Sequence, residues 1–264
     1  METKMTMQAN IYIIIPVLEY NSQELDKFLY NNQFLLKIPK LKILIKTTKQ
    51  AAISNEYIIN VNQPDSSIYQ AWNQSISKLI SFEHKFNFYA IFCGLDDVLM
   101  ENFFTKAQAF MSAKPDIIFG NIEVLVDNNI KFLKSNPYSS MLKNSEKKKW
   151  DIFHPGMFMN GRLFQQFSFD ENYQLAADFK FFVEVSNRLD FTNQYIGETQ
   201  ALINLNGISN KPNARSTYLR ELEKIASECD VEIVGFNTLL EIIKMKILSS
   251  WCGDYIRRIY WALK

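Results

Sequence analysis

The chain is poor in cysteine, which argues against a scaffold built on disulfides. It holds only Cys93, Cys229 and Cys252 among its 264 residues. An odd number of widely spaced cysteines matches neither a disulfide framework nor a CxxC metal site. Such usage is typical of a reducing compartment, so we expect a cytoplasmic protein.

An excess of charge of one sign is also missing, as are long apolar runs. The 29 Lys and Arg residues nearly balance the 28 Asp and Glu residues, without the basic surplus of a general nucleic-acid binder. No stretch approaches the roughly 18 uninterrupted apolar residues of a membrane span, and residues 1–10 are too polar for a signal peptide. We therefore expect no nucleic-acid partner, and any membrane contact should be peripheral.

The chain does have enough apolar residues for a substantial core, since 47% of its residues are hydrophobic. Short apolar runs predict strands, and apolar residues at helical spacing predict the helices between them. Strands are expected at residues 11–15, 41–45, 57–61, 88–92, 116–119 and 122–126, and helices at 21–31, 68–80 and 101–113. This alternation indicates an α/β fold with a mostly parallel sheet and helices on both faces.

The next segments depart from that alternation. Asn128 and Asn129 predict a hairpin turn between residues 122–126 and 130–133. Residues 135–149 are the most loop-like part of the chain, and they end in three consecutive lysines. These lysines form either a solvated face or a mobile loop that meets an anionic ligand or lipid.

The C-terminal part is predicted to be helical at residues 218–227, 239–248 and 251–263. Its last helix mixes aromatic and cationic side chains, which suits either a peripheral membrane helix or a helix docked on the core or on a partner subunit. We expect one α/β domain over residues 1–214 and a helical extension over residues 215–264. If the last helix meets a membrane, the expected place is the inner face of the plasma membrane.

The most informative feature is a buried strand that ends in acids. The apolar run 88–92 leads through Gly94 into Asp96 and Asp97, and an isolated acid, Asp178, follows about eighty residues later. Carboxylates just past a strand lie at the carboxyl edge of an open sheet, where α/β folds bind ligands. A metal-held phosphate would fit there. The alternative is that one of these two acids, Asp96 or Asp97, only caps the helix beginning near residue 101.

Four segments, taken together and in order, resemble a known family. They are IIIP at 13–16, PDSSIYQAWN at 64–73, YAIFCGLDD at 89–97, and HPGMFM at 154–159 continuing through FDENY at 169–173 and AADF at 176–179. A GIS triplet at 207–209 follows. The set resembles the family 2 glycosyltransferases of the GT-A fold, of the bacterial surface-polysaccharide type.

The resemblance implies roles for individual residues. Asp97, with Asp96, would hold a divalent cation, Mn²⁺ or Mg²⁺, that bridges the diphosphate of a nucleotide sugar. Asp178 would be the catalytic base, the alternative being a carboxylate that satisfies backbone N–H groups at a helix start. The donor-side candidates are Pro16, Asp65, Asn73 and Asp96, and the acceptor-side candidates are His154, Arg162 and Ser209. A purely structural role is the alternative for His154.

The implied function is inverting transfer of a sugar from a nucleotide-sugar donor to a glycan or lipid-linked glycan acceptor. One departure favours an alternative, a non-catalytic protein of the same fold that binds a glycan or a partner. The family has an acidic turn after its second strand, whereas residues 47–50 read TTKQ. A nucleotidyltransferase would need a Gly- and Lys/Arg-rich loop after the first strand, which residues 17–21 lack.

Overall fold

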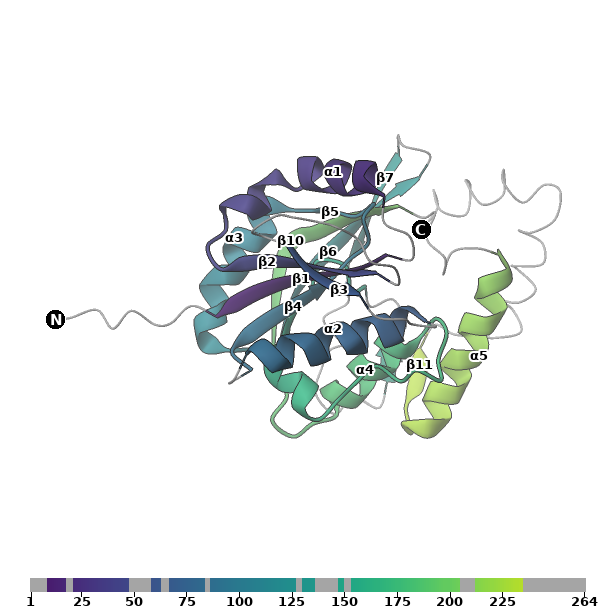
Figure 1. Cartoon of the computed structure of the whole chain (residues 1–264). Coiled ribbons are helices and arrows are strands. Elements are labelled where there is room, and N and C mark those ends of the chain that lie inside the picture. Colours follow the sequence, from purple (N-terminus) through teal and green to yellow (C-terminus); the bar gives the residue numbers. More distant parts are fainter. Residues whose placement is uncertain are drawn as a thin grey trace.

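A mixed sheet forms the centre of the computed structural model, in which the structure describes residues 9–17, 21–47, 58–62, 67–83, 86–126, 130–135, 147–149, 153–204 and 212–234 (Figure 1). Within these ranges the sheet has nine strands in the order β3-β2-β1-β4-β9-β6-β10-β5, and β7 pairs with β6. The strands are β1 Asn10–Val17, β2 Leu41–Thr47, β3 Ile58–Asn62, β4 Phe88–Phe92, β5 Val98–Leu99, β6 Ile117–Val126, β7 Ile130–Ser135, β9 Phe158–Asn160 and β10 Asn193–Asn204.

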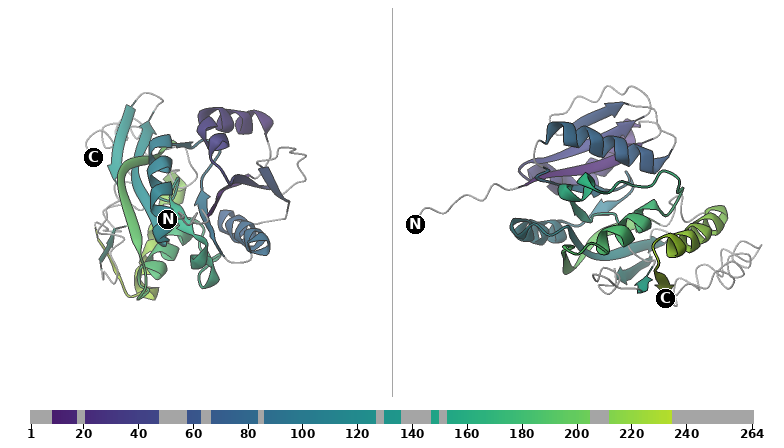
Figure 2. Two further views of the ribbon diagram at one scale, coloured as in Figure 1. Left: turned by 90° about the vertical axis from the view of Figure 1, so that its left-hand side faces the viewer. Right: turned by 90° about the horizontal axis from the view of Figure 1, so that it is seen from below.

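Helices cover both faces of this sheet, as the alternation of strands and helices predicts. They are α1 Ser22–Asn31, α2 Ile68–Phe82, α3 Glu101–Phe110, α4 Ala177–Ser186 and α5 Pro212–Glu228, with short 3₁₀ turns η1 Gln33–Lys37, η2 Met111–Ala113 and η4 Gly161–Gln165. α1 and α3 lie on one face of the sheet, and α2 and α4 lie on the other (Figures 1 and 2).

The two faces have separate apolar cores because neighbouring residues of a strand point to opposite sides. In β1, Ile11 and Ile13 pack into the cluster that includes Phe28 of α1. Tyr12 and Ile14 pack into the cluster that includes Trp72 of α2. A strand buried on both faces requires the continuous apolar run that the sequence shows here.

Four strands on one side of the sheet are parallel. β1 pairs with β2 and with β4, and β2 pairs with β3, always in parallel. Their carboxyl ends therefore meet at one edge of the sheet. β9 runs antiparallel to both β4 and β6, so it reverses direction between them.

Two of the predictions for individual segments are wrong. The strands expected at 116–119 and 122–126 are one strand, β6, which passes through Gly120; a Cβ there would lie 2.3 Å from the carbonyl oxygen of Glu198. The lysines at the end of the expected loop form β8, Lys147–Lys149, which pairs in parallel with β11, Glu232–Val234. Local sequence patterns could not predict this pairing, since its two strands are more than eighty residues apart in the chain.

The predicted hairpin strands do pair, with Val126 opposite Ile130 in an antiparallel ladder. The predicted C-terminal helices at 239–248 and 251–263 lie outside the described residues. α5 spans the expected boundary after residue 214, and its Leu222 and Ile225 belong to the same core cluster as Trp72. The division of the chain into two domains stays a prediction.

One buried amide holds the acid-bearing turn after β4 in place. Asn32, at the C-terminal end of α1, donates from Nδ2 to the carbonyls of Phe28 at 2.9 Å and Asp97 at 3.2 Å. Its Oδ1 accepts from the N–H of Leu99 at 2.7 Å. The fully buried side chain thus joins a helix on one face of the sheet to the segment that carries Asp97.

We expect Asn32→Ala to lower the free energy of unfolding by about 2–4 kcal/mol, because it leaves buried backbone groups without partners. Urea unfolding measures this loss. Asn187→Ala is the matched control, since Asn187 is exposed at the same position of α4, and it should change stability by less than about 0.5 kcal/mol. Equal effects of the two variants would contradict the role of Asn32.

Candidate functional site

The candidate site lies at the carboxyl edge of the parallel strands. β4 ends at Phe92 and leads directly to Asp96 and Asp97. Because β9 is antiparallel to β4, the residues that precede β9 lie at the same edge, and His154 is four residues before it. The sheet therefore brings His154 to the acids from a segment almost sixty residues further along the chain.

Asp97 is held inside the turn that follows β4. Its Oδ2 accepts a hydrogen bond from the N–H of Gly94 at 2.7 Å, and only 9% of the residue is exposed. Asp96 is exposed. The alternative role for Asp97 as a helix cap is not observed, because the N-cap of α3 is Met100, which has no side-chain capping bond.

Burial changes the ionisation of Asp97. Removal from water raises the pKa of its carboxyl to about 6, opposed by the hydrogen bond from Gly94 and by the nearby His154, and supported by the negative charge of Asp96.

Asp178 lies in the first turn of α4, where three groups contact its carboxylate. Oδ1 accepts from the hydroxyl of Tyr69 at 3.2 Å and from the N–H of Phe179 at 2.9 Å. Oδ2 lies 2.9 Å from Nδ1 of His154. Tyr69 is in the first turn of α2, so the segment that resembles the donor side of the family touches the expected base. The structure thus joins Asp178 and His154 directly.

The imidazole of His154 is backed by an aromatic cluster. The ring of Trp72 meets it edge to face, with centroids 4.9 Å apart. Trp72 in turn packs against Phe92 and Phe169, at centroid distances of 4.7 and 4.9 Å. Apolar rings on this side restrict the rotation of the imidazole.

A buried glutamine fixes the backbone of the turn that carries His154. Nε2 of Gln200, on β10, donates to the carbonyls of Phe153 at 3.1 Å and Pro155 at 2.8 Å. Gly156 has a φ of +80°, and a Cβ there would lie 2.9 Å from the carbonyl oxygen of Gln200. The glycine is needed both for this backbone conformation and for the close approach.

A carboxylate from α5 holds the backbone just before Asp178. Glu221 accepts hydrogen bonds from three consecutive N–H groups, those of Gln174 at 2.6 Å, Leu175 at 2.9 Å and Ala176 at 2.8 Å. Ala176 is the N-cap residue of α4 and has no side chain that could cap the helix. Glu221 therefore supplies the negative charge that the start of α4 favours, while Asp178 remains in contact with His154.

A divalent cation fits this site if the substrate supplies part of its shell. Within the described ranges, no three His, Cys, Asp or Glu side chains form a group that could hold a metal ion. Mg²⁺ sites commonly use one or two carboxylates together with substrate phosphates. Asp97 and the exposed Asp96 match that donor set, and a bound cation would favour the ionised form of Asp97 against the cost of its burial.

The donor-side candidates have different positions. Pro16 lies near the carboxyl end of β1, opposite Lys46 of β2, and so at the expected edge. Asn73 is committed to the backbone of Phe169, to which it donates at 2.8 Å and from which it accepts at 3.0 Å. Asp65 lies outside the described residues, as does the acceptor-side candidate Ser209.

Ser67 lies directly before α2, at its N-cap position. Its hydroxyl accepts the N–H of Gln70 at 3.1 Å and caps the start of α2. Serine is among the preferred residues at such a position.

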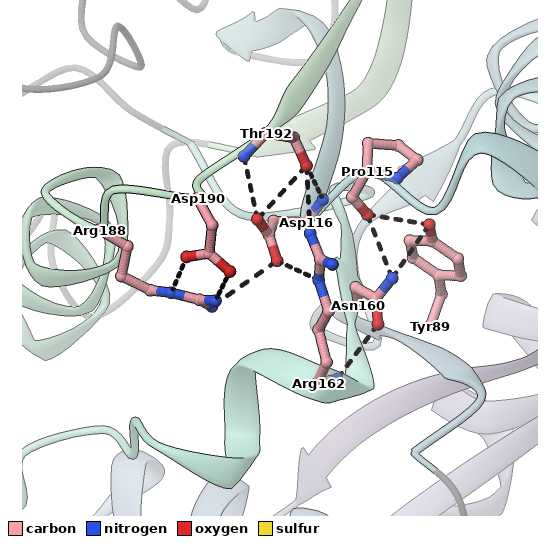
Figure 3. Close-up of polar contacts among 8 residues, drawn as sticks. All are labelled: Tyr89, Pro115, Asp116, Asn160, Arg162, Arg188, Asp190 and Thr192. Carbon is pink, nitrogen blue, oxygen red and sulfur yellow. Dashed lines mark hydrogen bonds and ion pairs between the residues drawn. The ribbon is translucent and has the colours of Figure 1, made fainter.

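Arg162 is not brought to this site. It follows the last residue of β9, so it lies at the opposite edge of the sheet from His154. Its guanidinium donates to Asp116, which is fully buried, at 2.6 Å, and to the hydroxyl of Thr192 at 3.2 Å (Figure 3). The proposed acceptor contact of Arg162 is therefore not supported, because the side chain neutralises a buried acid elsewhere.

Several residues that build the site were missed in the sequence. Tyr69 lies inside the segment that resembles the family, so its role could have been predicted from that segment. The roles of Gln200 and Glu221 could not be predicted, because a single glutamine in a strand and a single glutamate on an amphipathic helix look like ordinary surface residues.

No protein-family model matches the sequence, and no curated protein matches it. Solved structures do match. TarS from S. aureus shares 12% identity over 92% of this chain and 44% of its own, with a TM-score of 0.53. The mannosyltransferase PcManGT from Pyrobaculum calidifontis, in complex with GDP-Man and Mn²⁺, shares 11% identity over 94% of this chain and 73% of its own, with a TM-score of 0.54.

The chain has the GT-A fold. The mostly parallel sheet with helices on both faces is confirmed, and the chain spans less than half the length of TarS. Among the helices that the structure describes, none combines the length and the hydropathy needed to cross a membrane.

The buried acid of this GT-A fold should make stability depend on pH. The folded-state pKa of Asp97, about 6, lies above its ordinary value of 3.8, so its neutral form stabilises the fold below pH 4 and that contribution is lost as the pH rises through 6. Asp97→Asn cannot ionise. In metal-free buffer, we expect it to gain up to about 3 kcal/mol over the wild type between pH 4 and pH 8.

Urea unfolding at the two pH values measures this difference. Asp96→Asn is the control, because Asp96 is exposed and should show a much smaller gain. An Asp97→Asn variant with the same relative stability at pH 4 and pH 8 would contradict the burial argument.

Proposed function

We propose that this protein transfers a sugar from a nucleotide-sugar donor to the hydroxyl of a glycan acceptor, with inversion at the anomeric carbon. One observation supports it above the others. The turn that carries Asp97 and the turn that carries His154 lie at the same carboxyl edge of the sheet, and His154 contacts Asp178 there. Glycosyl transfer needs two such centres, one for the charge of the leaving diphosphate and one for the proton of the acceptor.

On the donor side, Asp97 and Asp96 would hold a divalent cation, Mn²⁺ or Mg²⁺, against the two phosphates. When bound, the cation supplies Lewis-acid stabilisation of the negative charge on the leaving group. The N–H of Gly94 binds the carboxylate of Asp97, and Asn32 from α1 binds its backbone carbonyl, so the Asp97 carboxylate is positioned before the donor arrives.

On the acceptor side, removal of the hydroxyl proton would depend on the carboxylate of Asp178. Its three hydrogen-bond partners hold it in one orientation, and Glu221 fixes the backbone before it. An acceptor hydroxyl that attacks from this side, opposite the departing diphosphate, would give inversion in a single displacement.

The finer assignments rest on the resemblance of the sequence segments alone. We propose a growing surface glycan such as capsule, lipopolysaccharide or exopolysaccharide as the acceptor, free or lipid-linked, and peripheral contact with the inner face of the plasma membrane. The alternative is a non-catalytic protein of the same fold that binds a glycan or a partner. TTKQ in place of the acidic turn after β2 motivates it.

A thermal-shift screen with UDP, GDP, CMP and dTDP sugars separates these two functions. We expect one nucleotide class to raise the melting temperature when Mn²⁺ is present, because a ligand that binds only the folded state stabilises it. Asp97→Asn should weaken that binding at least tenfold, whereas Asp26→Asn, at an exposed position of α1, should not change it. No shift with any donor would favour the binding protein, and metal-independent binding by Asp97→Asn would refute the role of Asp97.

Asp178→Asn should bind the donor as the wild type does but lose transfer by about 10²–10⁴-fold, because removal of the acceptor proton depends on this carboxylate. Titration calorimetry measures donor binding, and product formation from the donor identified in the screen measures transfer. Glu184→Gln, on the same helix, is the matched control and should retain activity. Full turnover by Asp178→Asn would show that proton removal does not depend on this carboxylate.

A further inference from the structure

The carboxylate of Asp178 is already engaged by donors from the protein. Oδ1 accepts two hydrogen bonds, from Tyr69 and from the N–H of Phe179, and Oδ2 contacts Nδ1 of His154. Burial and the neighbouring Asp178 raise the pKa of Tyr69 well above its usual value, so its hydroxyl stays protonated and remains a donor. Little of the accepting capacity of this carboxylate is left for an acceptor hydroxyl.

The same contacts determine which nitrogen of His154 carries a proton. An ionised carboxylate only accepts hydrogen bonds, so Nδ1 of His154 must be the donor in the 2.9 Å contact with Asp178. In the neutral ring, Nε2 then carries the lone pair. His154 is also the more accessible partner, since 25% of its side chain is exposed compared with 16% for Asp178.

We propose that Nε2 of His154, and not the carboxylate of Asp178, takes the proton from the acceptor hydroxyl. This inference rests on the proposed function. The acceptor oxygen forms its bond to the anomeric carbon while the bond from that carbon to the diphosphate oxygen breaks, and the diphosphate leaves with the electron pair. The proton moves to Nε2, and the resulting imidazolium later gives it to water.

The surroundings of His154 suit this task. The carboxylate of Asp178, 2.9 Å from Nδ1, faces the positive charge that forms on the ring. Trp72 packs edge to face against the ring and restricts its rotation. Imidazole is also a stronger base than a carboxylate by about 2 to 3 pKa units in water, which places it closer to the pH at which general bases act best.

The proposal predicts a ranking of two variants that each remove one partner of Asp178. His154→Gln keeps an amide that can donate but has no basic nitrogen, so transfer should fall by about 10²–10⁴-fold with donor binding retained. Tyr69→Phe removes one hydrogen bond to the same carboxylate and should reduce transfer only about fivefold to tenfold. If His154 only orients Asp178, the two losses should be similar, and that result would overturn the proposal.

The tautomer can be measured without any substrate. The chain has two histidines, so His84→Gln leaves His154 as the only imidazole for ¹⁵N NMR. In the neutral ring, we expect a protonated Nδ1 and an unprotonated Nε2. A proton on Nε2 would overturn the proposal.

These outcomes are distinct from failure of the proposed function. If the wild type binds no nucleotide sugar, the proposed function fails, and the step assigned to His154 fails with it. If the wild type binds and transfers while His154→Gln still transfers within tenfold of it, only the assignment of the base is wrong.

Discussion

The antiparallel pairing of β9 between β4 and β6 is the constraint on which the site depends. The parallel strands bring the acids after β4 to one edge of the sheet. If β9 were also parallel to β4, the residues that precede it would lie at the opposite edge. Because β9 runs the other way, the residues before it return to that edge and those after it leave at the opposite one. His154 and Arg162, eight residues apart, are separated in this way.

The opposite edge is organised around a buried charge. Asp116 is fully buried and is contacted by the guanidinium of Arg162 and by both the N–H and the hydroxyl of Thr192 (Figure 3). A buried carboxylate with several charge-assisted partners keeps its neighbours in fixed positions, and loss of one partner would leave an uncompensated charge. Arginine is therefore needed here for the structure, although from the sequence it looks like a residue that binds substrate.

Local patterns in the sequence predicted much of the fold. The continuous apolar run of β1 predicted a strand buried on both faces, and the helical spacing of apolar residues in α2 predicted a helix buried on one face. The two kinds of burial give different apolar patterns in the sequence. The position of Asp97 followed from the end of an apolar strand. The junction at Gly120 and the pairing of β8 with β11 were not predictable, since the first depends on the approach of β10 and the second on segments far apart in the chain.

In the site, too, individual residues could be predicted from the sequence but the contacts between them could not. Asp178 and His154 stood out as chemical groups, but their contact depends on the turn that Gln200 supports from β10. The position of Asp178 also depends on Glu221, which lies beyond residue 214, the predicted end of the α/β domain. A chain cut there would lose the acceptor for three adjacent amides at the start of α4. Of these, Ala176 is buried, and a buried N–H without a partner costs about 1–3 kcal/mol. A fragment that keeps these contacts must include α5, so a truncation meant to isolate the sheet would also release the backbone that precedes Asp178.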